Sequence, residues 1–406
     1  MNRNLDVQVD KTTWPAAGLV PIFPATFQAG TTGYDLNIPA MLLMIGYLTT
    51  PTSSTGISLS EFWAWVRYLG AISNEANMSL THSFADLDAH QKTILSDDFG
   101  MGVPVLWLCD KLALKSIVDG RYFMQKFAAS VGALQRRTAK RGPNKTPDFV
   151  AQDVNGSWHV IECKGTQSGV EYCAQQLGTK GPPPTGGVAQ KCSIQFPNGH
   201  TGQRLACGLS IGIEGNTGSV LRVVDPEPDE PVVIEADKLQ FAEDAVTRGV
   251  MSRVLRMSGF EVAAEAIASP LGRSPDARHF KTRRQELDRK AMVLERDGRA
   301  RRELGDSERQ KLLFDKGFIG RELTFELPRS ILVNDDSVSH VILRQGVNRD
   351  AIHELEMNPT ADEFIEQTQS PWTELIGRNL IKSDGPVATM TVGDIFRSEL
   401  TLESRR

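Results

Sequence analysis

Cysteine is scarce in this chain of 406 residues, and no apolar run is long enough to cross a membrane. The five cysteines are an odd number without a Cys-x-x-Cys pair, so neither a disulfide framework nor a structural zinc site is expected. The longest apolar run covers residues 38–48, which is too short for a bilayer. The first residues also lack the charged and then apolar pattern of a signal peptide. These absences predict a soluble, cytoplasmic protein without a membrane partner.

The sequence also lacks the short motifs of several large enzyme classes. No HExxH, GxSxG, Walker or GxGxxG pattern occurs, which argues against a zinc protease, a serine hydrolase, an ATPase and a dinucleotide-binding enzyme. The formal net charge is −5, so any binding of nucleic acid has to come from a local basic patch. The composition is that of an ordinary globular protein, and its chemistry has to lie in a local cluster of residues.

The chain is longer than one hydrophobic core usually organises, so several regions are expected. A proline-rich, acidic segment at residues 225–231 is predicted to be a boundary. We expect a partly helical N-terminal region at 1–95, an α/β domain at 96–224 and a mostly helical C-terminal region at 232–406. The last region contains a basic stretch at 273–311, which favours either contact with DNA phosphates or a solvated helix face.

The α/β region contains the clearest chemical pattern, TPDFVAQDVNGSWHVIECKG at residues 146–165. Two strand-like runs, Pro147–Asp153 and Trp158–Lys164, flank an Asn-Gly pair, which is the strongest short signal for a β-hairpin. Glu162 and Lys164 end an otherwise apolar strand and share one face of it. Both are costly to bury unless something pairs them. The segment predicts either a metal site or an exposed hairpin with a surface Glu–Lys pair.

Asp148 joins such a site only if the hairpin has the right register. With a strict two-residue turn, Asp148 lies opposite Cys163 and on the wrong face. With a three-residue loop, or one bulge, it lies opposite Lys164 or Glu162 and shares their face. A metal site therefore predicts an odd loop or a bulge in this hairpin.

Helices are expected on both sides of the hairpin. Residues 103–117 are predicted to be helical, and the Ser, Asp and Gly residues at 96–102 predict a loop before that helix. A shorter helix is expected at 168–177, and a long one at 237–260.

Two carboxylates and a lysine at the edge of a sheet suffice for hydrolysis of a phosphodiester. Mg²⁺ prefers oxygen ligands, usually one or two carboxylates with waters and phosphate. It neutralises charge on the scissile phosphate and helps to activate water. A lysine beside the metal polarises the attacking water or binds phosphate as a point charge. The Cys163 side chain is expected to point away into packing, while its backbone carbonyl faces the metal.

The order Pro147-Asp148, thirteen residues, Glu162-Cys163-Lys164 resembles the signature of the PD-(D/E)xK nuclease superfamily. The resemblance covers the α/β region only. It implies an α/β, restriction-endonuclease-like mixed sheet flanked by helices. It also implies that Asp148 and Glu162 bind Mg²⁺, with Mn²⁺ as a substitute, and that Lys164 assists the attacking water.

Members of this superfamily often add an acid on an upstream helix and a glutamine on the helix after the motif. The candidates for these accessory roles are Asp110, Asp98, Asp97 and Glu75 for the acid, and Gln175 and Gln176 for the glutamine. The segment directly before the motif is basic and is expected to guide a phosphate backbone, against the alternative of a solvated loop. Its basic residues are Arg136, Arg137, Lys140, Arg141 and Lys145.

Together with the resemblance, these residues predict a Mg²⁺-dependent endonuclease that hydrolyses DNA phosphodiester bonds. Restriction or anti-phage defence is the expected role, and DNA is the expected partner. Cutting both strands would call for a homodimer, a higher oligomer or a partner protein. The alternative is a catalytically inactive protein of the same fold that binds nucleic acid or assembles a complex.

Overall fold

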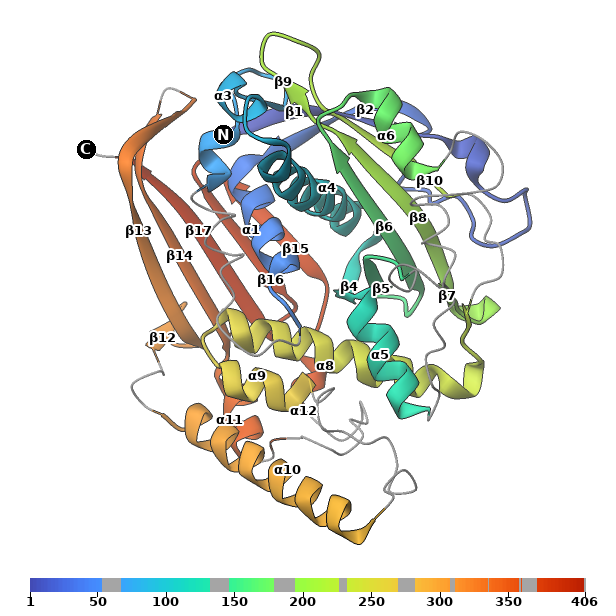
Figure 1. The fold of residues 1–406 in the computed structure, drawn as a ribbon, viewed down its shortest axis with the longest axis vertical. Coiled ribbons are helices and arrows are strands. Elements are labelled where there is room, and N and C mark those ends of the chain that lie inside the picture. The colour runs from blue at the N-terminus through green and yellow to red at the C-terminus, as the bar shows by residue number, and fades with distance from the viewer. Residues whose placement is uncertain are drawn as a thin grey trace.

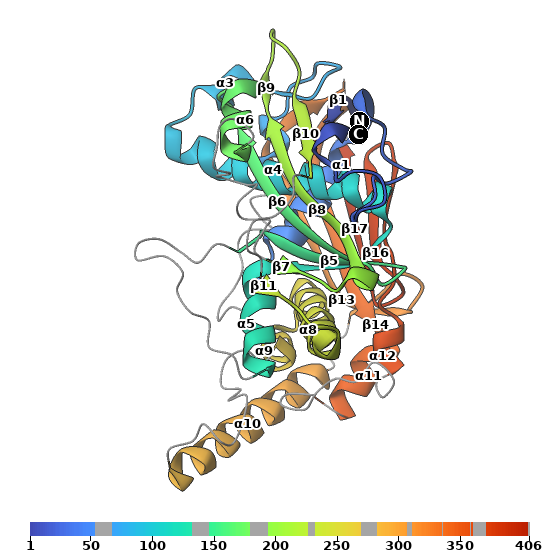
Figure 2. The same cartoon turned by 90° about the vertical axis from the view of Figure 1, so that its right-hand side faces the viewer.

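The computed structural model describes residues 1–52, 67–131, 146–178, 194–225, 232–268, 282–306, 311–334, 336–357, 359 and 371–404, apart from the side chains of 286, 289 and 328. Within these ranges two β-sheets stand side by side, with helices between and around them (Figures 1 and 2). The predicted α/β class is confirmed.

The larger elements follow one another along the whole chain. The strands are β1 (Asn2–Val9), β2 (Gly30–Asn37), β3 (Ser79–Leu80), β4 (Leu114–Asp119), β5 (Phe149–Asp153), β6 (Trp158–Thr166), β7 (Ile194–Gln195), β8 (Thr201–Ser210), β9 (Gly212–Ile213), β10 (Val220–Val224), β11 (Val232–Val233), β12 (Lys311–Leu313), β13 (Phe318–Val333), β14 (Asp336–Asn348), β15 (Asn379–Asp384), β16 (Val387–Val392) and β17 (Phe396–Ser404). The α-helices are α1 (Ile38–Thr49), α3 (His82–Ala85), α4 (Ala89–Leu112), α5 (Gly120–Ser130), α6 (Val170–Leu177), α8 (Leu239–Met257), α9 (Glu261–Ala268), α10 (Arg283–Leu304), α11 (Arg349–Met357) and α12 (Pro371–Glu374). Short 3₁₀ turns cover Lys11–Thr13, Leu69–Ala71, Asn198–His200 and Ala236–Lys238.

The first sheet is mixed and carries the predicted hairpin. Its strand order is β2-β1-β10-β8-β6-β5-β4, with parallel pairing of β1 with β10 and of β6 with β8. Strand β6 lies inside this sheet and is buried along almost its whole length, which explains its nearly continuous apolar run. The sheet also includes β1 and β2, from the region that was expected to flank the α/β domain.

The second sheet corrects the expectation of a mostly helical C-terminal region. Residues 311–404 form a six-stranded antiparallel sheet in the order β12-β13-β14-β17-β16-β15. Its strands alternate buried and more exposed residues, as in β16 (Val-Ala-Thr-Met-Thr-Val) and β17. This period of two is that of a half-buried strand, whereas the helical pattern of α8, α9 and α10 ends at Leu304.

Two helices fill the space between the sheets (Figure 1). Helix α1 contacts β15, β16 and β17 on one side and α4 on the other, while α4 contacts β6 and β8. Residues 38–48, the longest apolar run, are all buried in α1. The Asn37 side chain caps this helix by accepting a hydrogen bond from the Ala40 N–H (3.0 Å). Among the described residues, no helix is long and apolar enough to span a bilayer.

The expected loop at 96–102 lies inside α4, and the expected helix at 103–117 ends at Leu112. The glycines of this segment mark close contacts within a helix instead of a loop. A Cβ on Gly100 would lie 2.5 Å from the backbone nitrogen of Gly165 on β6, and one on Gly102 would lie 2.3 Å from Ile45 Cγ1 on α1. Helix α4 can cross β6 this closely only without side chains at the crossing.

Candidate metal centre

The hairpin between β5 and β6 has a three-residue loop, residues 154–156. Phe149 pairs with Ile161 and Gln152 pairs with Trp158, so Asp148 faces Glu162 in the register of the two strands. Gly156 adopts a positive φ of 82°, which the loop requires and which glycine accommodates at little cost. The prediction of an odd loop is therefore confirmed, and it places both carboxylates on one face of the sheet.

The two carboxylates are fixed by reciprocal hydrogen bonds across the strands. The Asp148 N–H donates to Glu162 Oε2 (3.1 Å), and the Cys163 N–H donates to Asp148 Oδ2 (2.8 Å). The Glu162 side chain is completely buried, whereas Asp148 is half-buried. Within the described part of the chain, Asp148 Oδ1 accepts no hydrogen bond, so one oxygen of the pair is free to bind a ligand.

Lys164 lies directly beside this pair. Its Nζ donates to Glu162 Oε1, and a quarter of its side chain is exposed (25%). Cys163 points to the opposite face, where it is buried and pairs with Cys207 of β8, as expected. The N–H and C=O of one strand residue point to the same side of the strand. Since the Cys163 N–H points at Asp148, its carbonyl faces that side as well.

Charge at this site is unbalanced towards the negative sign. Burial, and then the negative charge of Asp148, raise the pKa of Glu162 to about 8 against the opposing effect of Lys164. Burial likewise raises the pKa of Asp148, and the Lys164 charge lowers it. The neighbouring carboxylates raise the pKa of Lys164 although its own burial acts in the other direction. A buried carboxylate pair with one ammonium leaves charge that a divalent cation would offset.

A third carboxylate, Asp97, reaches this site by its charge from α4. Partial burial raises the pKa of Asp97 and the Lys164 ammonium lowers it, while Asp97 in turn raises the pKa of Asp148. The close crossing of α4 over β6 places Asp97 near the end of the strand, because a Cβ on Gly165 would lie only 1.8 Å from the Ser96 carbonyl oxygen. Asp97 is therefore the upstream acid that the structure brings towards the motif.

The other acidic candidates have different surroundings. The Asp98 carboxylate accepts a hydrogen bond from the Tyr68 hydroxyl. Asp110 pairs with Lys111 (3.1 Å) and is exposed. It lies thirteen positions after Asp97 in α4, which is about 20 Å along a helix. The structure therefore does not bring Asp110 to the motif.

The glutamine candidates lie on α6, next to the lysine. Gly208 pairs with Lys164 across β6 and β8, and a Cβ on Gly208 would lie 2.6 Å from the sulfur of Cys173 on α6. Gln175 is exposed on this helix. Gln176 is half-buried, and its Oε1 has no hydrogen-bond partner among the described residues. The helix after the motif thus carries a free amide oxygen on the side of the sheet where Lys164 lies.

The backbone of Asp148 is held from the other neighbour strand. The Gly120 N–H donates to the Asp148 carbonyl (2.8 Å), and a Cβ on Gly120 would lie 2.0 Å from the Pro147 carbonyl oxygen. The preceding Asp119 forms a buried ion pair with Arg253 of α8 (2.9 Å). Sequence reasoning missed this support, because nothing in the sequence of α8 distinguishes a buried arginine from an exposed one.

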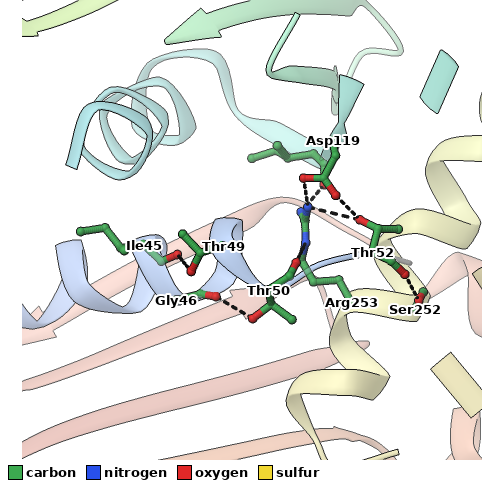
Figure 3. Close-up of polar contacts among 9 residues, drawn as sticks. Ile45, Gly46, Thr49, Thr50, Thr52, Asp119, Ser252 and Arg253 are labelled. Carbon is green, nitrogen blue, oxygen red and sulfur yellow. Dashed lines mark hydrogen bonds and ion pairs between the residues drawn. The ribbon is translucent and has the colours of Figure 1, made fainter. Parts of the chain in front are cut away.

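Figure 3 shows how Arg253 joins four segments of the chain. Its guanidinium also donates to the carbonyls of Thr50 (3.3 Å) and Ile117 (2.8 Å). Thr52 is a further partner of Asp119. The arginine thereby connects the end of α1, strand β4 and helix α8 directly behind the motif.

The basic residues predicted to guide a phosphate backbone, Arg136, Arg137, Lys140, Arg141 and Lys145, lie outside the described residues. The described chain leaves α5 at Val131 and returns at Thr146, directly before Pro147. Their role stays a prediction.

The residues of the motif fit a magnesium ion better than a metal held by side chains alone. Among the described residues, no group of three or more His, Cys, Asp and Glu side chains is placed to hold a metal ion. Two facing carboxylates and a strand carbonyl fit Mg²⁺, which usually keeps several waters and takes one or two carboxylates. Such a set does not fit a structural zinc site with four protein ligands.

Comparison of the chain with protein-family models, with curated proteins and with solved structures finds no match in any of the three.

Proposed function

We propose that this protein is a Mg²⁺-dependent endonuclease that hydrolyses DNA phosphodiester bonds with a restriction-endonuclease-like α/β domain. One observation carries the proposal: Asp148 and Glu162 face each other on adjacent strands at a buried position, with Lys164 beside them. Proteins seldom bury two carboxylates together unless a cation or a proton compensates them.

In the proposed reaction, Asp148, Glu162 and the Cys163 carbonyl hold the cation, which supplies neutralisation of phosphate charge and a more acidic water. Lys164 orients the attacking water through one of its N–H groups and stabilises charge on the phosphate. The water oxygen forms a bond to phosphorus as the bond to the leaving sugar oxygen breaks. Asp97 adds negative charge that favours the cation, and Gln176 offers an amide near the lysine.

Restriction or antiviral defence is the role that we propose for this activity. It would suit a nuclease whose sequence contains no ATPase motif. Cleavage of both DNA strands would require two such sites, supplied by a homodimer or a larger assembly.

A second candidate function rests on the hydrogen bonds of Glu162. Both of its carboxylate oxygens already have partners, Lys164 and the Asp148 N–H, as in a structural ion pair. A protein of this fold without catalysis would bind nucleic acid or assemble a complex through other surfaces.

A cleavage assay separates the two candidates. Purified protein is incubated with supercoiled, linear and single-stranded DNA, with Mg²⁺, with Mn²⁺ and with a chelator. The nuclease proposal expects metal-dependent cleavage that Glu162→Ala and Glu162→Gln abolish, while Glu235→Gln at an exposed position leaves it unchanged. Circular dichroism checks the fold of each variant. Binding of DNA without cleavage would favour the second candidate, and cleavage by Glu162→Gln at the wild-type rate would refute the first.

A further inference from the structure

A polar cavity lies away from the carboxylate pair, between the β4–β5 edge, helix α8 and residues 373–376. Strand β4 packs against α8, which runs below it in Figure 1. The cavity has a volume of about 280 Å³. A single water needs only about 10–15 Å³ by the same measure, so this space admits a small organic molecule.

A β-bulge shapes one wall of the cavity. Leu114 pairs with Asp153 and Ser116 pairs with Gln152, so Lys115 is an extra residue in β4. In a regular strand, consecutive residues point to opposite faces. Here Lys115 and Ser116 both line the cavity, because the bulge turns one of them.

Three polar side chains in the wall are more than nine-tenths buried and lack partners. They are Ser116, Gln152 and Thr247, with exposed fractions of 4%, 8% and 7%. None of the three side chains forms a hydrogen bond with another described residue, and all of them line the cavity. Buried hydroxyl and amide groups without partners cost free energy, so their presence points to a ligand or to ordered water.

The cavity also contains opposite charges that do not neutralise each other directly. Lys115 and Glu243 are both half-buried, and neither forms an ion pair with a described residue. Burial raises the pKa of Glu243, while the charges of Lys115 and His200 lower it. Lys115 thus acts on Glu243 across a distance longer than a salt bridge. Glu374, exposed at the rim, adds a second carboxylate.

We propose that this cavity binds a small zwitterion of the amino-acid type, with its ammonium group towards Glu243 and its carboxylate towards Lys115. Ser116, Gln152 and Thr247 would then hydrogen-bond the rest of the ligand. A simple anion such as phosphate would face two carboxylates for one ammonium. A simple amine would leave Lys115 opposed by a like charge, and a neutral polyol would leave both charges unpaired.

This site does not depend on the proposed nuclease activity. None of the motif residues lines the cavity. Gln152 follows Asp148 by four positions, which is about 13 Å along a strand. A protein that cleaves no DNA and still binds the zwitterion leaves this inference intact.

Isothermal titration calorimetry with the common free L-amino acids tests the inference. We expect at least one of them to bind. Its amide, which lacks the carboxylate, and its N-acetyl derivative, which lacks the ammonium, should each bind about tenfold more weakly. Failure of every amino acid to bind would overturn the proposal, and so would binding that is indifferent to the removal of either charge.

Charge-removing variants assign each group to its partner. Lys115→Gln should weaken binding of the amino acid but not of its amide, and Glu243→Gln should weaken binding of the amino acid but not of its N-acetyl form. Thr247→Val should weaken binding while raising the thermal midpoint of the free protein, because it removes an unpartnered hydroxyl. Glu235→Gln is the exposed control and should change neither property. Equal losses for both derivatives in both variants would refute the assigned orientation.

Discussion

Replacing Glu162 with glutamine should stabilise the protein at alkaline pH and at the same time remove its response to Mg²⁺. Glu162 is completely buried, and burial together with the charge of Asp148 raises its pKa from 4.5 to about 8. The unfolded chain loses this proton near the ordinary pKa, whereas the folded chain keeps it until about pH 8. The folded state therefore binds more protons in between, and its stability falls as the pH rises through this window.

The size of the fall follows from the two pKa values. At about 1.36 kcal/mol for each pKa unit, the rise of the Glu162 pKa corresponds to roughly 3–5 kcal/mol between pH 5 and pH 9. Below about pH 4.5 the carboxyl is protonated in both states and contributes nothing. A glutamine cannot ionise, so the variant should lose this component and exceed the wild type in stability at pH 9. Mg²⁺ that binds the carboxylates should restore stability to the wild type only.

Urea unfolding followed by tryptophan fluorescence at pH 5, 7 and 9, with and without Mg²⁺, measures these differences. Glu235→Gln, at an exposed position, is the matched control and should follow the wild type at every pH. Parallel pH profiles of Glu162→Gln and the wild type would refute a buried, proton-binding carboxylate. Equal stabilisation of both by Mg²⁺ would refute Glu162 as a ligand.

Four further changes test the remaining parts of the site. Gly165→Ala should cost about 1–3 kcal/mol or more in urea unfolding and lower cleavage, because its Cβ would meet the backbone of α4, whereas Gly199→Ala, in open space, should be neutral. Lys164→Ala and Lys164→Arg should both lose most single-turnover cleavage with Mg²⁺ affinity near that of the wild type, and an active arginine variant would exclude a role at the water. Changing the three arginines of residues 136–141 to glutamine should lower the log–log salt slope of DNA binding by about 0.9 for each lost phosphate contact, and an unchanged slope would show a solvated loop. Arg253→Met should cost about 3–5 kcal/mol in urea unfolding, since it leaves a buried ion pair without one partner, and a change near zero would contradict that role.

The hairpin was predictable because its register depends on the parity of a short loop. Asp148, Glu162 and Lys164 could share a face only with an odd loop or a bulge, and the structure has a three-residue loop. Local geometry decides such a question, so the sequence contains the answer. The identity of the upstream acid was not decidable in this way, because Asp97 and Asp98 differ only in how α4 crosses β6.

The errors have a common physical origin in tertiary packing. Gly100 and Gly102 suggested a loop by their conformational freedom, yet α4 uses them for close contact with β6 and α1. The C-terminal strands contain many charged residues on their exposed positions, and this composition resembles that of the preceding helices. Their period of two became evident only with the burial of alternate residues in β16 and β17.

The parallel pairing of β1 with β10 has a consequence for synthesis on the ribosome. Asp6 pairs with Val220, so the first strand waits for a partner that is translated more than two hundred residues later. At about 5–20 residues per second, this interval lasts roughly 10–40 s. During that time β1 can pair only with β2, and its other edge exposes backbone groups to neighbouring nascent chains. A slower translation rate between these strands should lengthen the exposure, and expression with a chaperone that shields strand edges should raise the soluble yield.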